Sequence, residues 1–307
     1  MFFVALATDY DGTLAKDGRV DAPTIDALRA LQPSGRKLIL VTGRELPDLK
    51  RVFPALDLFD MVVAENGGLL FEPAKNEEVP LAEPPPATFV ARLREVGVSP
   101  LSVGRTIVST WEPNEIAVLK VLHELGLELH IIFNKGAVMV LPAEVNKAFG
   151  LKHALDRLCL SPHNVVAIGD AENDLAFLGI CGCAVAVGNA LPSVKAKADF
   201  LVRDHGAGVR DIGRRLTDAD FSAAKMRVPH AQPIIGRRRN GSELHLSPFE
   251  TVLITGSSGG GKSTIVTALL EQMCTGGFQF CVVDPEGDYV ELSDAVVVGT
   301  AKLEPRL

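Results

Sequence analysis

The sequence contains 307 residues, of which 47% are hydrophobic and 22% are charged, and its formal net charge is −7. This composition is ordinary for a globular protein with a packed core, and the length favours about two domains. The negative charge makes a nucleic-acid partner for this chain alone an unfavourable hypothesis. Because no run of about 18 apolar residues and no signal peptide is recognisable, we expect a cytoplasmic protein without a membrane span. Nothing in the sequence indicates an oligomeric state.

Short apolar runs alternate with amphipathic segments along residues 1–216. This alternation predicts an α/β fold in which a mostly parallel sheet is flanked by helices. Strands are expected at Phe3–Thr8, Lys37–Val41, Met61–Ala64, Val165–Ile168 and Ala184–Val187, and helices between them include Pro23–Leu31 and Lys147–Leu158. We assign residues 1–83 and 143–216 to this main domain.

An inserted unit is predicted at residues 84–142. The proline-rich run Glu83–Pro86 cannot continue a helix or a central strand, so it indicates a hinge. After it come a helix from Ala87, strands around Leu101–Thr110, a helix at Asn114–Leu125, and strands at Glu128–Phe133 and Ala137–Leu141. The insert is therefore a small α/β unit. Its candidates for facing a cleft are Arg92, Arg105, Trp111, Glu112, Asn114 and His130, although a place in the core is favoured for Trp111.

Two carboxylates follow the first predicted strand, in the stretch ATDYDGTL. Asp9 and Asp11 are two residues apart, so a tight turn after the strand can aim both at one point beyond the sheet edge. Gly12 permits that turn, and Thr13 follows it. Because neighbouring acids repel each other, the pair needs a cation or a shared proton. Taken alone, the motif could also be a turn with capping acids.

Three further stretches carry polar residues at predicted strand or helix ends. They are Thr42-Gly43-Arg44 after the second strand, Lys147 at the start of a helix, and Gly169, Asp170, Asn173 and Asp174 after a later strand. Taken singly, each has an ordinary explanation as a strand-end turn, an exposed lysine or a helix-capping acid. Those explanations account poorly for the ordered set.

The complete set matches the needs of phosphate-ester hydrolysis, whose uncatalysed rate is very low and whose transition state needs positioning and charge neutralisation. One carboxylate can act as the nucleophile, and a second acid can move the proton. Mg²⁺ prefers oxygen ligands and screens the carboxylates from the phosphate. A lysine and a hydroxyl can hold the remaining phosphoryl oxygens.

With these four motifs in order, residues 1–216 resemble the haloacid dehalogenase (HAD) superfamily, in particular its Cof-type and sucrose-phosphatase-like branch. The resemblance implies a HAD-type Rossmannoid parallel sheet, with residues 84–142 as a cap that selects the substrate. It also implies a Mg²⁺-dependent phosphatase that forms an aspartyl-phosphate. The implied substrate is a small phosphorylated metabolite, for which a sugar phosphate is the best candidate.

The resemblance assigns roles to individual residues. Asp9 is the implied nucleophile and Asp11 the implied general acid and base, and Thr42 and Lys147 complete the catalytic set. The implied phosphate ligands are Thr42, Gly43 and Lys147. The implied Mg²⁺ ligands are Asp9, the backbone carbonyl of Asp11, Asp170 and Asp174, with Gly12, Thr13, Arg44 and Asn173 in supporting positions.

The last part of the sequence contains a second phosphate-binding motif. Residues 217–247 are expected to be a linker with a solvated basic turn at Arg237–Arg239. In the stretch GSSGGGKST, a P-loop is predicted between a strand at Thr251–Ile254 and a helix at Lys262–Gln272. Its expected nucleotide-binding residues are Gly256, Gly261, Lys262, Ser263 and Thr264, with Lys262 on the phosphates and Ser263 on Mg²⁺. A flexible glycine linker is the alternative.

The stretch FQFCVVDPEGDYVEL predicts a second strand that ends at Asp284. With the P-loop it resembles HerA-type DNA-translocase ATPases over residues 248–292. No later strand ending in an acid and no arginine finger is recognisable in the sequence, so residues 248–307 are expected to be a partial P-loop NTPase segment, either part of a longer fusion or a remnant. Two functions follow: a phosphatase, which the four motifs favour, or an ATP-binding module of a DNA translocase with a regulatory HAD domain.

Overall fold

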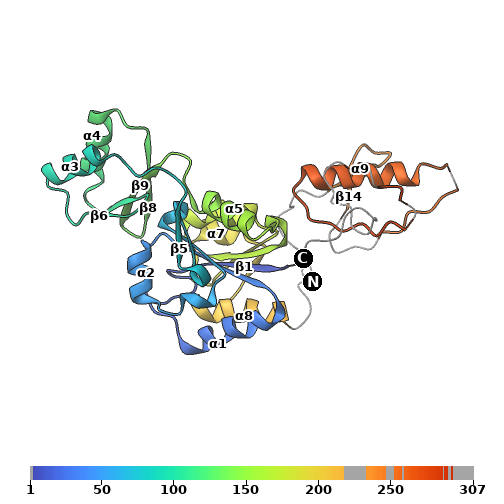
Figure 1. Ribbon diagram of the computed structural model, residues 1–307, viewed down its shortest axis with the longest axis horizontal. Helices are drawn as coiled ribbons and strands as arrows, with labels where there is room; N and C mark the ends of the chain where they lie inside the picture. Colours follow the sequence, from blue (N-terminus) through green and yellow to red (C-terminus); the bar gives the residue numbers. More distant parts are fainter. Residues whose placement is uncertain are drawn as a thin grey trace. The chain divides into compact units, whose positions relative to one another are not determined.

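The computed structural model describes residues 3–217, 233–246, 252–257, 259–285, 287–289 and 292. The chain divides into two compact units, residues 1–228 and 229–307, which we describe separately. Figure 1 shows the elements of both units in chain order by colour. No helix in the described ranges combines the length and the apolar character needed to cross a bilayer.

The first unit is built on an eight-stranded sheet with the strand order β12-β11-β10-β1-β2-β3-β4-β5. The strands β12, β11, β10, β1, β2 and β3 run parallel, and β4 and β5 extend the sheet in antiparallel pairs. The bounds are β1 Ala5–Asp9, β2 Lys37–Val41, β3 Met61–Ala64, β4 Leu69–Glu72, β5 Glu77–Pro80, β10 Val165–Gly169, β11 Cys183–Ala186 and β12 Phe200–Leu201.

Helices cover both faces of this sheet (Figure 1). They are α1 Ala22–Leu31, α2 Leu46–Val52, α5 Lys147–Arg157, α6 Leu175–Ile180, α7 Pro192–Lys197 and α8 His205–Thr217. Because helices lie on both faces, the central strands are buried along their whole length, as in β1 and β10, and are mostly apolar, with Thr8 and Asp9 as the polar end of β1. The predicted α/β fold with a mostly parallel sheet is confirmed. The predicted ends of these strands and helices of the main domain agree with the observed ones to within two residues.

The insert between β5 and α5 forms a smaller α/β unit, which we call the cap. A four-stranded antiparallel sheet in the order β6-β7-β9-β8 packs against α3 and α4 through a cluster that includes Phe89, Leu93, Val118 and Val138. The bounds are α3 Ala87–Glu95, β6 Ser102–Val103, β7 Val108–Trp111, α4 Glu115–Leu125, β8 Leu129–Asn134 and β9 Ala137–Pro142.

The expectation that Trp111 belongs to the core of the cap is wrong. Side chains alternate between the two faces of a strand, and in β7 it is Thr110 that points into the cap core. Trp111 therefore lies on the open face of the sheet and is 54% exposed.

The cap is fastened to the main sheet through Glu65, which follows β3 in a short 3₁₀ turn, Glu65–Gly67. Its fully buried carboxylate accepts hydrogen bonds from the backbone N–H groups of Arg105 (3.0 Å) and Thr106 (2.7 Å) and from the hydroxyl of Thr106 (3.0 Å). These residues belong to the loop between β6 and β7. A buried side chain of the main domain thus serves as the acceptor for the cap loop between β6 and β7, in which Thr106 is itself buried.

The second unit contains a hairpin and one helix in its described residues. The strands β13 Ile234–Arg237 and β14 Glu243–His245 pair antiparallel, and α9 spans Lys262–Thr275. The side chain of Gln272 on α9 bonds both backbone groups of Ile234, at 2.8 and 3.1 Å. Residues 233–246 thus form regular structure where the sequence predicts a linker, because Asn240-Gly241 supports a hairpin turn. Residues 218–232 and 247 lie outside the described residues.

The two strands predicted around the P-loop are absent from the described residues, so that prediction is wrong. Residues 252–257 and 278–285 have no strand pairing, and Leu253 and Val283 are 84% and 90% exposed. A strand needs a hydrogen-bonded neighbour, and the described part of this unit supplies none to either segment. The helix prediction is confirmed, since α9 includes Lys262–Gln272.

Candidate active site

The predicted site residues of the main domain meet at one edge of the sheet. The strand β1 lies between β10 and β2, all parallel, so Asp9 at the end of β1, Thr42 after β2 and Asp170 after β10 share the carboxyl-terminal edge. These three residues are at most 4% exposed. The edge is therefore a buried polar site rather than a set of solvated turns.

Lys147 reaches this edge from the start of α5. The helix begins there because the Asn146 side chain accepts a hydrogen bond from the N–H of Phe149 (3.0 Å). Gly67, whose φ is +106°, lets the backbone approach closely, since a Cβ at this position would overlap the carbonyl of Asn146. The Lys147 ammonium donates to Asp9 Oδ1 at 2.6 Å and to Asp174 Oδ1 at 2.5 Å. With only 2% exposure, Lys147 is not the solvated helix lysine of the alternative explanation.

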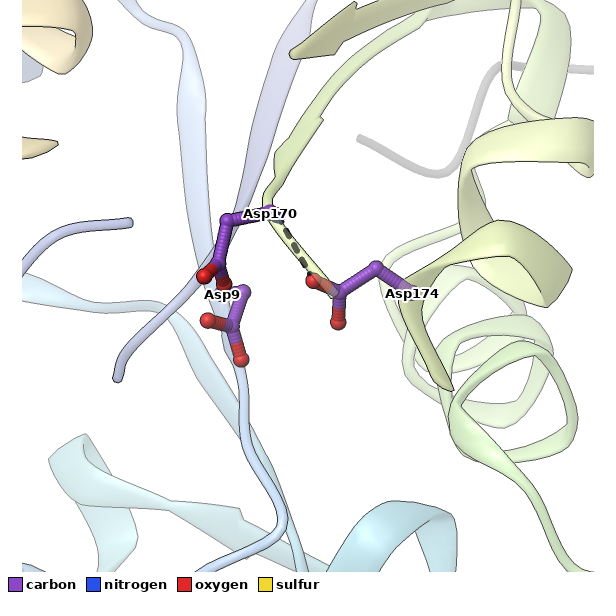
Figure 2. Close-up of side chains that lie close together, drawn as sticks. All are labelled: Asp9, Asp170 and Asp174. Atoms are coloured by element: carbon purple, nitrogen blue, oxygen red, sulfur yellow. Dashed lines mark hydrogen bonds between the residues drawn. The ribbon is translucent and has the colours of Figure 1, made fainter. Parts of the chain in front are cut away.

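Asp9, Asp170 and Asp174 form a buried carboxylate cluster, in which one oxygen of each lies within 4.8 Å of the others (Figure 2). The second oxygen of Asp174 accepts the backbone N–H groups of Asp170 (2.8 Å) and Ala171 (2.9 Å), which fixes its orientation. The carboxylate of Asp11 is not a member of this cluster. The three acids therefore lie together, with the buried ammonium of Lys147 bonded to Asp9 and Asp174.

The electrostatics of the cluster show an excess of negative charge. Burial and the charge of Asp174 raise the pKa of Asp9 to about 8, although the charge of Lys147 opposes this. Burial also raises the pKa of Asp170 against the hydrogen bond from Lys135. For Lys147, burial alone would lower the pKa, but the charges of Asp174 and Asp9 outweigh it and raise the pKa. Oxygen donors with uncompensated negative charge fit a hard divalent cation such as Mg²⁺.

The side chain of Asp11 is held by Arg44. The guanidinium donates from Nε to Asp11 Oδ2 at 2.6 Å and from Nη2 to Oδ1 at 2.8 Å, and it also bonds Asp48 at 2.5 Å. These hydrogen bonds, that to Asp11 first, raise the pKa of Arg44 against the effect of burial. The backbone carbonyl of Asp11 points elsewhere and accepts a hydrogen bond from Lys135 Nζ at 2.8 Å. The carbonyl thus shares the Lys135 ammonium with Asp170, while the carboxylate is bonded to Arg44.

The other predicted residues of the first two motifs pack closely around the acids. Gly12 has a φ of +92°, and a Cβ there would overlap the carboxylate of Asp170, so this turn requires glycine. The Thr13 hydroxyl donates to Asp170 Oδ1 at 3.3 Å. The buried Thr42 hydroxyl accepts the N–H of Arg44 at 3.2 Å. Gly43 follows beside it.

Asn173 lies against Asn66, a residue that the sequence does not single out. The Asn173 amide donates to Asn66 Oδ1 at 3.1 Å, while Asn66 Nδ2 and Asn173 Oδ1 are buried without a partner in the described part of the chain. Asn66 has a left-handed backbone, with a φ of 54°. The sequence signal for it is the ENGG turn directly after β3, at the same sheet edge.

Lys135 is the second residue that sequence reasoning misses. It belongs to the cap, yet its ammonium donates to Asp170 Oδ2 at 2.9 Å as well as to the Asp11 carbonyl. By contrast, several predicted cap candidates have other partners: Arg92 pairs with Glu95 and Glu124, Arg105 with Glu78, and His130 with the Ala143 carbonyl. The available signal was the Asn-Lys-Gly turn between two predicted strands, which places a lysine at the tip of a hairpin.

The P-loop residues lie in the second unit, at the start of α9. Gly261, whose φ is +81°, is the N-cap of this helix, and Lys262, Ser263 and Thr264 form its first turn. The Lys262 ammonium folds back onto the carbonyls of Gly256 (3.1 Å) and Ser257 (2.9 Å). The Ser263 hydroxyl donates to Asp288 Oδ2 at 3.3 Å. The loop, lysine and hydroxyl thus stand in the order that the motif predicts.

The acid predicted after the P-loop, Asp284, organises its own turn. Its carboxylate accepts the backbone N–H groups of Gly287 (2.9 Å), Asp288 (3.2 Å) and Tyr289 (2.9 Å). Both oxygens are therefore engaged in local structure.

Comparison with known proteins identifies both parts of the chain. Residues 6–94 and 115–209 match the haloacid dehalogenase-like hydrolase family, and residues 249–306 match the central domain of the helicase HerA. The phosphoglycolate phosphatase of Methanothermobacter thermautotrophicus is 32% identical over 224 residues, which cover 69% of this chain and 98% of that protein. Phosphoglycolate phosphatase 1 of Saccharolobus solfataricus is 32% identical over 234 residues, 71% of this chain and 97% of that protein.

Solved structures show the same fold. A haloacid dehalogenase-like hydrolase from Bacteroides thetaiotaomicron superposes with a TM-score of 0.61 at 18% identity, covering 70% of this chain and 99% of its own. A HAD/Cof-like hydrolase from Plasmodium vivax gives a TM-score of 0.61 at 19% identity, with 71% and 96% covered. Family, relatives and fold agree with the carboxylate edge described above. The chain therefore belongs to the haloacid dehalogenase-like hydrolase family and is a phosphoric monoester hydrolase.

Proposed function

We propose that the main domain is a Mg²⁺-dependent phosphatase that works through an aspartyl-phosphate on Asp9. The observation that carries this proposal is the buried cluster of Asp9, Asp170 and Asp174 with Lys147 as their single buried ammonium. Such a cluster is costly to bury unless it binds something positive. Held by Asp9, Asp170 and the Asp11 carbonyl, with Asp174 in support, Mg²⁺ would neutralise charge on the phosphoryl group.

In the first half-reaction, an oxygen of Asp9 attacks phosphorus and the bond to the leaving oxygen breaks. Lys147 fixes the attacking carboxylate and favours its ionised form, since its charge lowers the pKa of Asp9. The Thr42 hydroxyl and the Gly43 amide are proposed to bind phosphoryl oxygens at the same sheet edge. Asp11 gives its proton to the leaving oxygen, so that an alcohol departs.

In the second half-reaction, Asp11 takes a proton from water, and the water oxygen attacks phosphorus. The bond between phosphorus and the Asp9 oxygen breaks, which releases phosphate and restores the carboxylate. Both oxygens of Asp11 are bonded to Arg44 in this structure. Proton transfer therefore requires the Asp11 carboxyl group to turn away from Arg44 during the cycle.

The proposed substrate is a small phosphorylated acid of the phosphoglycolate type. Sequence motifs alone favour a sugar phosphate, but the curated relatives described above are named phosphoglycolate phosphatases and are covered almost completely by the alignments. The cap supports a charged substrate as well, because it places a lysine at the site.

A substrate panel tests this proposal. Phosphate release is measured with 2-phosphoglycolate and with a set of hexose and pentose phosphates, each in Mg²⁺ and in chelator. We expect hydrolysis in Mg²⁺ only, with the highest kcat/KM on 2-phosphoglycolate. Metal-independent turnover would contradict the Mg²⁺ role, and a preference for a sugar phosphate would contradict the substrate assignment.

ATP binding by the second unit is a separate candidate function. The glycine turn before α9, with Lys262 and Ser263 in its first turn, supports it, as does the match of residues 249–306 to the HerA central domain. We propose that this unit binds ATP-Mg²⁺ weakly, because the Lys262 ammonium must first break its hydrogen bonds to the carbonyls of Gly256 and Ser257. Calorimetric titration of ATP-Mg²⁺ into the wild type and Lys262→Ala is the test. Equal binding by both proteins would contradict a P-loop site.

A further inference from the structure

The contact between Lys135 and the main domain joins the cap to the catalytic edge. The ammonium lies 2.8 Å from the Asp11 carbonyl and 2.9 Å from Asp170 Oδ2, and the Lys135 side chain is 52% exposed while that of Asp170 is 5% exposed. A Cβ on Gly12 would come within 2.5 Å of the same ammonium. The cap therefore places a positive charge at the exposed side of the site, next to the turn that contains Asp11 and Gly12.

The hairpin that carries Lys135 has a regular antiparallel pairing between β8 and β9. Lys135 and Gly136 form a two-residue turn between β8 and β9, with φ values of 51° and 85°, the conformation typical of tight hairpins. The Gly136 carbonyl accepts the N–H of Glu112 at 2.9 Å, which ties the turn to the end of β7. The Trp111 ring lies beside the turn, since a Cβ on Gly136 would lie 3.8 Å from Trp111 Cε3. The lysine is thus held at a defined place.

The partners of Lys135 are oxygens that the proposed function assigns to Mg²⁺. An ammonium and a divalent cation a few ångströms apart repel strongly in a partly buried site. Lys135 must therefore leave the Asp11 carbonyl and Asp170 when the metal binds, while the hairpin keeps its charge at the exposed side of the site. In the described residues, two other cations are bonded to acids at this edge. Arg44 and Lys147 each bond two carboxylates, whereas Lys135 bonds one. We therefore expect Lys135 to be the cation that leaves its partners when the metal binds.

We propose that Lys135 is the specificity-determining residue of the cap and that, with metal in place, its ammonium binds a carboxylate on the leaving side of the substrate. The inference rests on the proposed function. A substrate with a carboxylate gives the displaced ammonium a charged partner, whereas a neutral leaving group leaves it without one. A hydrogen bond between two charged groups is strong enough to discriminate between such substrates.

The kinetic test compares 2-phosphoglycolate with 2-hydroxyethyl phosphate, in which a hydroxymethyl group replaces the carboxylate. In the wild type, kcat/KM should favour 2-phosphoglycolate. In Lys135→Met that preference should fall by roughly 10- to 100-fold, as expected for loss of a charged hydrogen bond. Lys135→Arg should retain most of it. Lys120→Met removes an exposed cap lysine on α4 and serves as the matched control with an unchanged preference.

A second measurement does not depend on turnover. Mg²⁺ is titrated calorimetrically into the substrate-free proteins, and Trp111, the only tryptophan of the chain, reports on the hairpin by its fluorescence. Lys135→Met should bind Mg²⁺ several-fold more tightly than the wild type, because no ammonium has to be displaced. The wild-type fluorescence should change as Mg²⁺ binds, and that of Lys135→Met should change less.

The outcomes separate the two proposals. A wild type that hydrolyses both substrates with Mg²⁺ but without preference overturns the role of Lys135 and leaves the phosphatase standing. An unchanged preference in Lys135→Met, or Mg²⁺ affinity equal to or below that of the wild type, also overturns it. A wild type that hydrolyses neither substrate overturns the proposed function and this inference with it.

Discussion

At the scale of residues, the site is a balance of buried charges. The ammonium of Lys147 faces three carboxylates, and the pKa of Asp9 is raised to about 8 by burial and by Asp174. The cluster therefore opposes folding in the absence of a further cation, and this cost is what a metal ion would relieve. Stability and metal binding are linked through the same atoms.

Asp9→Asn is expected to stabilise the metal-free protein at pH 8 by on the order of a few kcal/mol, and to change its stability little at pH 4. A carboxyl group with a raised folded pKa binds its proton more tightly when folded, so its cost is absent below its unfolded pKa. The cost grows as the pH rises from 3.8 towards about 8 and is nearly constant above that. Urea unfolding of both proteins in chelator measures the difference. A difference that does not grow with pH would contradict the electrostatic account.

Asp11→Asn is expected to lower kcat by about 10²–10⁴-fold, the usual worth of general acid–base catalysis. Mg²⁺ affinity should be retained, because the backbone carbonyl of Asp11 remains. Asp48→Asn is a suitable control, since Asp48 also bonds Arg44 but does not belong to the turn after β1 that carries Asp11. Steady-state kinetics and a Mg²⁺ titration are the measurements. Equal losses of kcat in the two variants would show that Asp11 has no special role in proton transfer.

At the scale of elements, several polar contacts connect the cap to the main domain, including hydrogen bonds from Ser102 and Ser109 to the Glu45 carboxylate. Two others are the Lys135 contact at the hairpin tip and the Glu65 carboxylate beneath the loop between β6 and β7. The cap helices and strands have their own core around Phe89 and Val138. These polar contacts therefore set the position of the cap on the site, while its internal packing sets its shape.

Glu65→Ala is expected to destabilise the protein by roughly 3 kcal/mol, because two backbone N–H groups and the Thr106 hydroxyl lose their acceptor. Glu78→Ala is the matched control: Glu78 also contacts Arg105, but at the surface, where an ion pair is worth about 0–1 kcal/mol. Urea unfolding compares the variants, and hydrogen exchange at residues 104–107 reports the local change. Equal stability losses would contradict a buried anchoring role for Glu65.

The sequence predicts the elements that carry the chemistry better than those that surround them. Each parallel strand is a short apolar run that ends in a polar motif, so Lys37–Val41 and Met61–Ala64 are predicted with their observed bounds. The antiparallel strands β4 and β5 are not predicted: β5 lies at the sheet edge and has no apolar pattern, whereas β4 is a short apolar run. Lys135 is missed because its role depends on where the cap hairpin meets the main sheet. That tertiary contact has no local signal.

At the scale of the whole molecule, one chain contains two different motifs that the sequence predicts to bind phosphate. The first unit places acids and a buried lysine at the carboxyl ends of parallel strands, and the second places a glycine turn at the start of α9. The tail strands were predicted wrongly because apolar runs such as residues 278–283 form strands only beside a pairing neighbour, which the described residues do not provide. The helix was predicted correctly because its pattern is local.

Lys262→Ala is expected to leave the phosphatase kcat and KM unchanged within about twofold, because the described residues of the carboxylate edge all belong to the first unit. The same variant should lose the ATP binding measured by calorimetry. Both assays are done on one preparation of each protein. A folded variant with reduced phosphatase activity would show that the two units act on each other.

The central claim is that Asp9 is phosphorylated during turnover, and one measurement addresses it directly. Wild-type protein and Asp9→Asn are mixed with ³²P-labelled 2-phosphoglycolate in Mg²⁺, quenched in acid, and assayed for protein-bound label and for released phosphate. The wild type should carry label that hydroxylamine removes, and Asp9→Asn should carry none and turn over slower by several orders of magnitude. Folded Asp9→Asn protein that releases phosphate at the wild-type rate would contradict the account.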